Sequence, residues 1–197
     1  MSTTGRAFVA VVPSDEALDA IDFATASLRG SVPDARWTMR DQWHVTLQFL
    51  GNHVDLNAVA GALGALSEVG GDARLGGGGA FPGEGRGRVL WLGLAEGTEL
   101  VGRLASAVGT LLTPVGYEPD TRPFHAHLTL ARLKAPSDLR VVVAALDAMA
   151  IGPAWPVDEV VLFQSHTRRT GAEYEELART SLAPRTAPSD RDGAPVG

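Results

Sequence analysis

The chain has 197 residues, of which 45% are hydrophobic and none is cysteine, and its formal net charge is −6. This length suits one domain, or two small lobes that share a core. The lack of cysteine excludes a disulfide framework, a thiolate nucleophile and a zinc–thiolate site. The acidic balance argues against a protein that holds long nucleic acids through a basic surface. No apolar run is long enough to cross a bilayer and the N-terminus lacks a secretory cleavage pattern, so we expect a cytoplasmic protein without membrane attachment.

Hydrophobic periodicity and helix-capping residues predict an alternation of strands and helices along the chain. Ser14 is expected to cap the first helix and Asp55 the second. The glycine run at 76–79 is interpreted as a flexible turn, because no Gly-Lys-Ser/Thr sequence follows it as in a phosphate-binding loop. The predicted strands span 6–12, 43–50, 89–94, 124–132, 157–164 and 173–181, and the predicted helices span 14–29, 55–70, 98–113 and 137–149. This order predicts an α+β fold.

A four-residue pattern, His-x-Thr-Leu, occurs twice, each time within an apolar, β-branched run that is typical of a strand. The residues concerned are His44 and Thr46 in the first copy and His127 and Thr129 in the second. Because side chains alternate between the two faces of a strand, the histidine and threonine of each copy share one face. Two such strands side by side would bring two imidazoles and two hydroxyls into one cleft. The other interpretation is that both histidines are half-buried strand residues bonded to nearby backbone.

The two pattern strands fall at comparable places in the two halves of the chain, which supports two lobes related by an approximate two-fold axis. We expect residues 1–183 to form a single bilobal domain. The segment 184–197 is rich in Pro, Ala, Asp and Gly and has almost no large apolar residue, so it is predicted to be a disordered tail.

The repeated motif and its flanking segments resemble the 2H phosphoesterases, and among them the bacterial and archaeal RNA 2′,3′-cyclic phosphodiesterases, also called 2′-5′ RNA ligases. The segments that carry the resemblance are RAFVA at 6–10, Trp37 followed by HVTLQFLG at 44–51, FP at 81–82, RVLWLG at 88–93, RPF at 122–124 leading into HLTLAR at 127–132, VVLFQS at 160–165 and GAEY at 171–174. Trp43 and Ala126, which precede the two motif histidines, depart from the family pattern. The resemblance implies two pseudo-symmetric lobes, with antiparallel sheets facing a central cleft and helices outside. It also implies hydrolysis of RNA 2′,3′-cyclic phosphate ends to 2′-phosphates. We expect the protein to be a monomer.

The residue types suit this chemistry. Histidine, with an ordinary pKa of about 6.5, can act as base toward water or as acid toward the departing ribose oxygen. Threonine hydroxyls can donate hydrogen bonds to the phosphate oxygens that carry the transition-state charge. The two motifs are symmetric and do not assign roles, but the resemblance implies that His44 donates the proton and His127 accepts it. It also favours Arg132 as a phosphate-binding residue.

The rest of the predicted site concerns base binding and metals. Phe124 and Trp43 are candidates to stack on a nucleobase, whereas Trp91 and Phe163 are interpreted as core residues. His125 and His127 have the alternate spacing of a metal-binding pair, but the five histidines are accompanied by no acidic cluster and no cysteine. No metal and no cofactor are therefore predicted.

Three alternatives share the four motif residues and stay open. The substrate could be a small cyclic nucleotide or an ADP-ribose cyclic phosphate instead of an RNA end. The reaction could run in reverse as 2′-5′ ligation. The protein could also bind RNA ends without catalysis, although a binding protein would not need both histidines.

Overall fold

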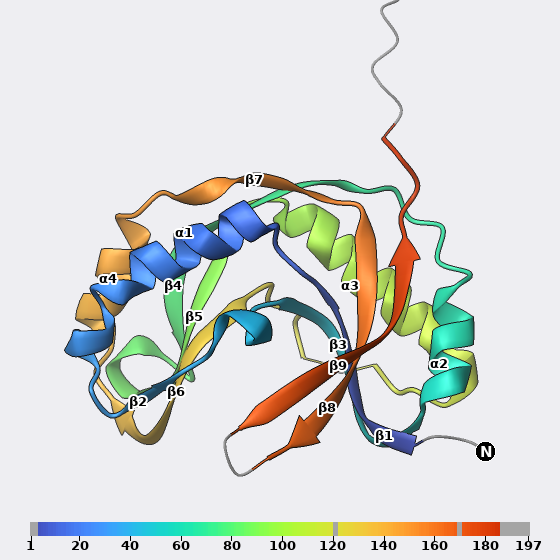
Figure 1. The fold of residues 1–197 in the computed structure, drawn as a ribbon, viewed down its shortest axis with the longest axis horizontal. Helices are drawn as coiled ribbons and strands as arrows, with labels where there is room; N and C mark the ends of the chain where they lie inside the picture. Colours follow the sequence, from blue (N-terminus) through green and yellow to red (C-terminus); the bar gives the residue numbers. More distant parts are fainter. Residues whose placement is uncertain (1–3, 120–121, 169–170, 186–197) are drawn as a thin grey trace, which may run out of the picture.

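The computed structural model describes residues 4–119, 122–168 and 171–185 (Figure 1). The described strands are β1 (Thr4–Val11), β2 (Ala35–Trp37), β3 (Val45–Asp55), β4 (Gly71–Phe81), β5 (Gly87–Glu96), β6 (Leu128–Ser137), β7 (Ile151–Val157), β8 (Glu159–Thr167) and β9 (Ala172–Ser181). The described α-helices are α1 (Asp15–Ala26), α2 (Leu56–Leu63), α3 (Thr98–Leu112) and α4 (Arg140–Asp147). The predicted α+β fold is confirmed. None of these helices is long and apolar enough to span a membrane.

The strands form one sheet in the order β7-β4-β5-β6-β3-β1-β8-β9, with β2 also paired to β6. The two central strands, β3 and β6, are joined through a single residue pair, Val45 with Leu128. Three further strands follow on each side of this junction, so the two predicted halves share one sheet. The helices cross over between the halves: α1 follows β1 but packs on β7, and α3 follows β5 but packs on β3 (Figure 1).

Both predicted helix caps are present. The Ser14 hydroxyl accepts a hydrogen bond from the Ala17 backbone N–H at 3.4 Å. The Asp55 carboxylate accepts from two backbone N–H groups of α2, each at 3.1 Å. The prediction that the second helix continues to residue 70 is wrong, because the chain leaves the helix after Leu63 and the Gly70 N–H bonds the carbonyl of Ala183 instead.

The glycine run at 76–79 is not a turn but the middle of β4, which pairs with β5 on one edge and β7 on the other. The glycines are needed because neighbours approach the backbone closely. A Cβ on Gly78 would lie 2.8 Å from Leu146 and 3.0 Å from the Val143 carbonyl of α4, and a Cβ on Gly79 would lie 2.0 Å from the ring of Trp91. The missing side chains let α4 pack directly on the strand and let an indole lie across the strand's other side.

Gly79→Ala is therefore expected to lower the free energy of unfolding by about 1–3 kcal/mol, since the added methyl overlaps a rigid indole. Urea denaturation measures the change. Gly83→Ala is the matched control, because its Cβ meets no atom within 4 Å. Equal stabilities for the two variants would contradict this account of the glycine strand.

Three strands, β2, β4 and β7, were absent from the prediction, and the two motif strands begin later than predicted, at Val45 and Leu128. Most of the predicted tail, residues 186–197, lies outside the described residues. Arg185 is described, and its guanidinium forms two hydrogen bonds to the Asp72 carboxylate at 2.8 and 3.2 Å. The chain thus keeps contact with β4 as far as Arg185.

Candidate active site

The junction of the two half-sheets brings both motifs together. Val45 pairs with Leu128 in an antiparallel register, so one step backward along β3 corresponds to one step forward along β6. By this register His44 lies across from Thr129, and Thr46 lies across from His127. The four motif side chains therefore gather on one face of the sheet, at the point where the halves meet.

Burial confirms which face this is. The intervening apolar residues, Val45 and Leu47 on β3 and Leu128 and Leu130 on β6, are at most 2% exposed. The motif histidines and threonines, which alternate with these apolar residues, are half-buried. The predicted alternation therefore holds at both motifs, with the leucines and valine in the core and the polar residues on the open face.

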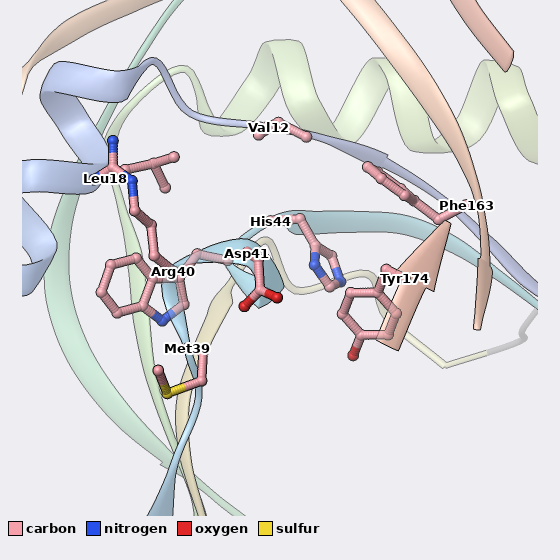
Figure 2. Close-up of a pocket in the computed structure, with 9 residues that line it drawn as sticks. Val12, Leu18, Met39, Arg40, Asp41, His44, Phe163 and Tyr174 are labelled. Carbon is pink, nitrogen blue, oxygen red and sulfur yellow. The ribbon is translucent and has the colours of Figure 1, made fainter. Parts of the chain in front are cut away.

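His44 is held by aromatic rings from β1 and β9. Its imidazole stacks on Phe8 of β1 with ring centroids 4.5 Å apart, and it meets Tyr174 of β9 edge-on at 5.3 Å. Figure 2 shows the imidazole and the Tyr174 ring side by side, both pointing into the same space. The short turn Arg40–Gln42 precedes the motif, and the Gln42 carbonyl interacts with the imidazole.

His127 has a comparable setting in the other half. Its Nδ1 lies 2.8 Å from the backbone carbonyl of His125, so this nitrogen is the donor in the neutral ring and Nε2 is left to exchange protons with a ligand. Phe81 meets the ring edge-on at 5.0 Å, and Trp91 lies 6.1 Å from it. Each catalytic candidate is thus fixed by a carbonyl two residues earlier and by rings from other strands of the same half of the sheet.

Both imidazoles favour the neutral form. Desolvation lowers the pKa of His44 to about 4, against the opposing effect of the Gln42 carbonyl, and the charges of His127 and Arg132 lower it further. Desolvation also lowers the pKa of His127, as do the charges of His125 and Arg132, while the His125 carbonyl opposes them. An anionic ligand between the rings would act in the opposite direction and favour protonation.

Arg132 lies on β6, three residues after Thr129, and is exposed. Its charge contributes to the lowered pKa of both histidines and opposes the raised pKa of Tyr174. The guanidinium is therefore close enough to act electrostatically on residues of both halves. This position is consistent with the predicted phosphate contact, which stays a prediction.

Trp43 does not fit its predicted stacking role. The residue is only 3% exposed, and its indole N–H donates to the Thr38 hydroxyl at 2.9 Å. Thr38 in turn donates to the Leu130 carbonyl at 2.9 Å, so Trp43 ties the first motif to the second. Phe124 is 42% exposed, which leaves its ring face accessible, and its stacking role stays a prediction.

Two residues interpreted as core lie at the site instead. Trp91 and Phe163 are half-buried; Trp91 borders His127, and Phe163 stacks on Phe8 at 5.3 Å. The rings of Phe8, Phe81 and Tyr174 also belong to the site and were not predicted there. The one available signal was that all five belong to segments of the family resemblance or flank them.

A cavity of about 540 Å³ adjoins His44 (Figure 2). Its walls are mainly apolar, with Asp41 and Arg40 at the polar side, and its volume lies in the range of small-molecule sites. The lining residues are Val12, Leu18, Met39, Arg40, Asp41, Trp43, His44, Phe163 and Tyr174.

Metal ligands are sparse around the motifs. Within the described part of the chain, no group of three or more His, Asp or Glu side chains could hold a metal ion. The pair His125 and His127, whose spacing suggested a metal site, has ring centroids 6.2 Å apart, and one nitrogen of His127 faces the His125 carbonyl.

Comparison with known proteins agrees with the geometry. Residues 13–169 match the family model of the 2′-5′ RNA ligase superfamily. The RNA 2′,3′-cyclic phosphodiesterase of Aeropyrum pernix is 32% identical over 169 residues, which cover 80% of this chain and 94% of that protein. The protein of the same name from Thermus thermophilus is 33% identical over 190 residues, covering 90% of each chain.

Solved structures agree on the fold. The apo structure of Escherichia coli LigT superposes with a TM-score of 0.74 at 25% identity, covering 92% of this chain and 99% of LigT. A Thermus thermophilus structure gives 0.73 at 30% identity, covering 92% of this chain and all of that one. The chain therefore belongs to the 2′-5′ RNA ligase superfamily of 2H phosphoesterases, as its paired His-x-Thr motifs and their meeting at one junction indicated.

Proposed function

We propose that this chain is an RNA 2′,3′-cyclic phosphodiesterase that opens cyclic ends to 2′-phosphomonoesters, with His44 and His127 as its proton-transfer pair. The observation that carries the proposal is the junction of β3 and β6, whose register sets each motif histidine across from the other motif's threonine. The names of the Aeropyrum and Thermus relatives support the same reaction. Its substrate is an RNA end or a small nucleotide that bears a 2′,3′-cyclic phosphate.

The reaction needs a base and an acid on opposite sides of phosphorus, because the attacking and leaving oxygens are roughly in line. In the proposed sequence, His127 Nε2 takes a proton from water as the water oxygen bonds to phosphorus. The bond from phosphorus to the ribose O3′ breaks, and protonated His44 supplies the proton to O3′. The product has a 2′-phosphate and a free 3′-hydroxyl. Proton exchange with solvent then restores a neutral His127 and a protonated His44.

The phosphate oxygens need hydrogen-bond donors while this happens. Thr46 and Thr129 lie on the same face as the histidines and are half-buried, and Arg132 acts electrostatically on both rings. We propose that these three residues hold the non-bridging oxygens. The cavity beside His44 is proposed to take the terminal nucleoside, and Phe124 to stack on a base.

The direct test uses a short RNA with a 2′,3′-cyclic phosphate end, incubated with the protein and EDTA. Hydrolysis to a 2′-phosphate is expected, since the proposed chemistry uses only side chains. A 3′-phosphate product would contradict the proposed leaving oxygen. Loss of activity on chelation, with recovery on adding a divalent ion, would indicate metal-bound hydroxide instead.

Thr46→Val and Thr129→Val are each expected to lower kcat with little change in stability. Valine keeps the β-branched shape of threonine and removes only the hydroxyl. A lost donor to transition-state charge costs roughly 10²–10³-fold at the upper end. Urea denaturation and steady-state kinetics on the same samples separate the two effects. A stability loss as large as the activity loss would assign the hydroxyls a structural role.

A further inference from the structure

The second half of β3 does not continue the alternation that the motif begins. Val9 of β1 pairs with Gln48, but the next residue, Ala10, pairs with Thr46. β3 thus contains one extra residue at this point, a β-bulge. A bulge changes which face the following side chains occupy.

The consequence appears at Gln48 and Phe49. Simple alternation would put Gln48 on the open face beside Thr46. Instead its amide donates to the Ala105 carbonyl of α3 at 2.7 Å and accepts from the Tyr117 hydroxyl at 2.6 Å. Phe49, which alternation would bury, is 60% exposed.

Phe49 is continuous with the rings around the first catalytic histidine. Its ring centroid lies 6.2 Å from that of Phe8, and Phe8 stacks on His44 at 4.5 Å. Phe8 itself is buried beneath these neighbours. Phe49 is therefore the exposed end of a row of rings that starts at the proposed acid.

A cation lies on the same strand as Phe8, the ring that joins Phe49 to His44. Arg6 is exposed and stands two residues before Phe8 on β1, so the two side chains share a face by alternation. Its charge acts on the Tyr174 hydroxyl, whose ring contacts both Phe8 and His44. An exposed ring with a nearby cation is the combination that binds a base and a backbone phosphate of single-stranded nucleic acid.

We propose that Phe49 and Arg6 bind the nucleotide that precedes the cyclic phosphate, with Phe49 stacking on its base and Arg6 contacting the linking phosphate. This rests on the proposed function and narrows its substrate class. The preferred substrate is an RNA end of at least two nucleotides, and a cyclic mononucleotide is a poor substitute. An aromatic ring stacks on any base, so this site selects RNA substrates by their length and not by their sequence.

The test compares kcat/KM for adenosine 2′,3′-cyclic phosphate and for the dinucleotide ApA with the same cyclic end. In the wild-type protein the dinucleotide is expected to be the better substrate by about 5- to 140-fold, the range of one base–aromatic stacking contact. Phe49→Ala should remove most of this advantage, because it lowers kcat/KM for the dinucleotide far more than for the mononucleotide. Phe49→Trp should keep it, because the larger ring also stacks.

Phe23→Ala is the matched control. Phe23 lies on α1, is 87% exposed and has no part in the proposed site, so its loss should affect neither substrate. Arg6→Gln should lower kcat/KM for the dinucleotide more than for the mononucleotide.

The outcomes separate this inference from the function on which it rests. Equal kcat/KM for the two substrates, or a Phe49→Ala variant that keeps the wild-type preference, would overturn the Phe49 site and leave the phosphodiesterase function standing. A wild-type protein that hydrolyses neither substrate would overturn the proposed function, and the inference with it.

Discussion

His44→Ala and His127→Ala are each expected to lower kcat by about 10²–10⁴-fold, the usual contribution of one positioned proton-transfer group. Steady-state kinetics on an RNA with a 2′,3′-cyclic end measures the loss. The effect should be similar for the two variants, because the proposed reaction needs both a donor and an acceptor. The double variant should be little worse than either single one, since the two residues act as a unit.

The comparison needs folded protein, because His44 packs against Phe8 and Tyr174. Circular dichroism and a melting curve check each variant, and His44→Gln offers a closer match in size if the alanine variant is unstable. His53→Asn is the control histidine substitution. His53 has a backbone φ of 66°, which asparagine tolerates, and it lies outside the site. A folded His44 or His127 variant with nearly wild-type kcat would remove that residue from the mechanism.

The parts of the site that the sequence could predict are those with a regular period. In both motifs polar and apolar residues alternate along a strand, and the observed burial confirms that the apolar ones face the core. The helix caps Ser14 and Asp55 could also be predicted from the sequence, because a cap depends on local backbone geometry alone. These features need no knowledge of which strands become neighbours.

Three features had no such local signal. The glycine strand β4 has few side chains from which to read a period, and its glycines are explained only by α4 and Trp91, which are distant in sequence. The strand β7 contains Pro153 and Pro156, which argue against a central strand but are tolerated at a sheet edge, the place that β7 occupies. The bulge in β3 is visible only in its register with β1.

The aromatic side chains that contact the two histidines were not predicted, for the same reason. Phe8 and Tyr174 belong to strands that lie in different parts of the sequence, and only the sheet order β3-β1-β8-β9 brings them to His44. Trp91 and Phe163 have the apolar character of core residues, and their half-burial follows from their place beside the junction. Trp43 was predicted to stack on a base but is buried, and its indole N–H is satisfied by the Thr38 hydroxyl, a partner that the sequence does not reveal.

The pH dependence of kcat/KM is expected to be bell-shaped with its maximum below pH 6.5. The free enzyme must hold one proton on the two-histidine pair, and this form is most abundant between the two apparent pKa values of the pair. Desolvation lowers the pKa of His44 to about 4 and also lowers that of His127. Both limbs therefore fall below the ordinary histidine value. Above the upper limb, kcat/KM should fall about tenfold for each pH unit.

The free enzyme and the substrate complex are expected to differ in their pH optimum. A bound cyclic phosphate is anionic and favours the protonated imidazoles, so the maximum of kcat should lie at higher pH than that of kcat/KM. Arg132→Gln should move the kcat/KM maximum toward higher pH as well, since the charge of Arg132 lowers the pKa of both histidines. A profile that rises steadily to high pH would contradict the two-histidine mechanism. A bell whose limbs do not move in Arg132→Gln would contradict the electrostatic effect of Arg132 on the two histidines.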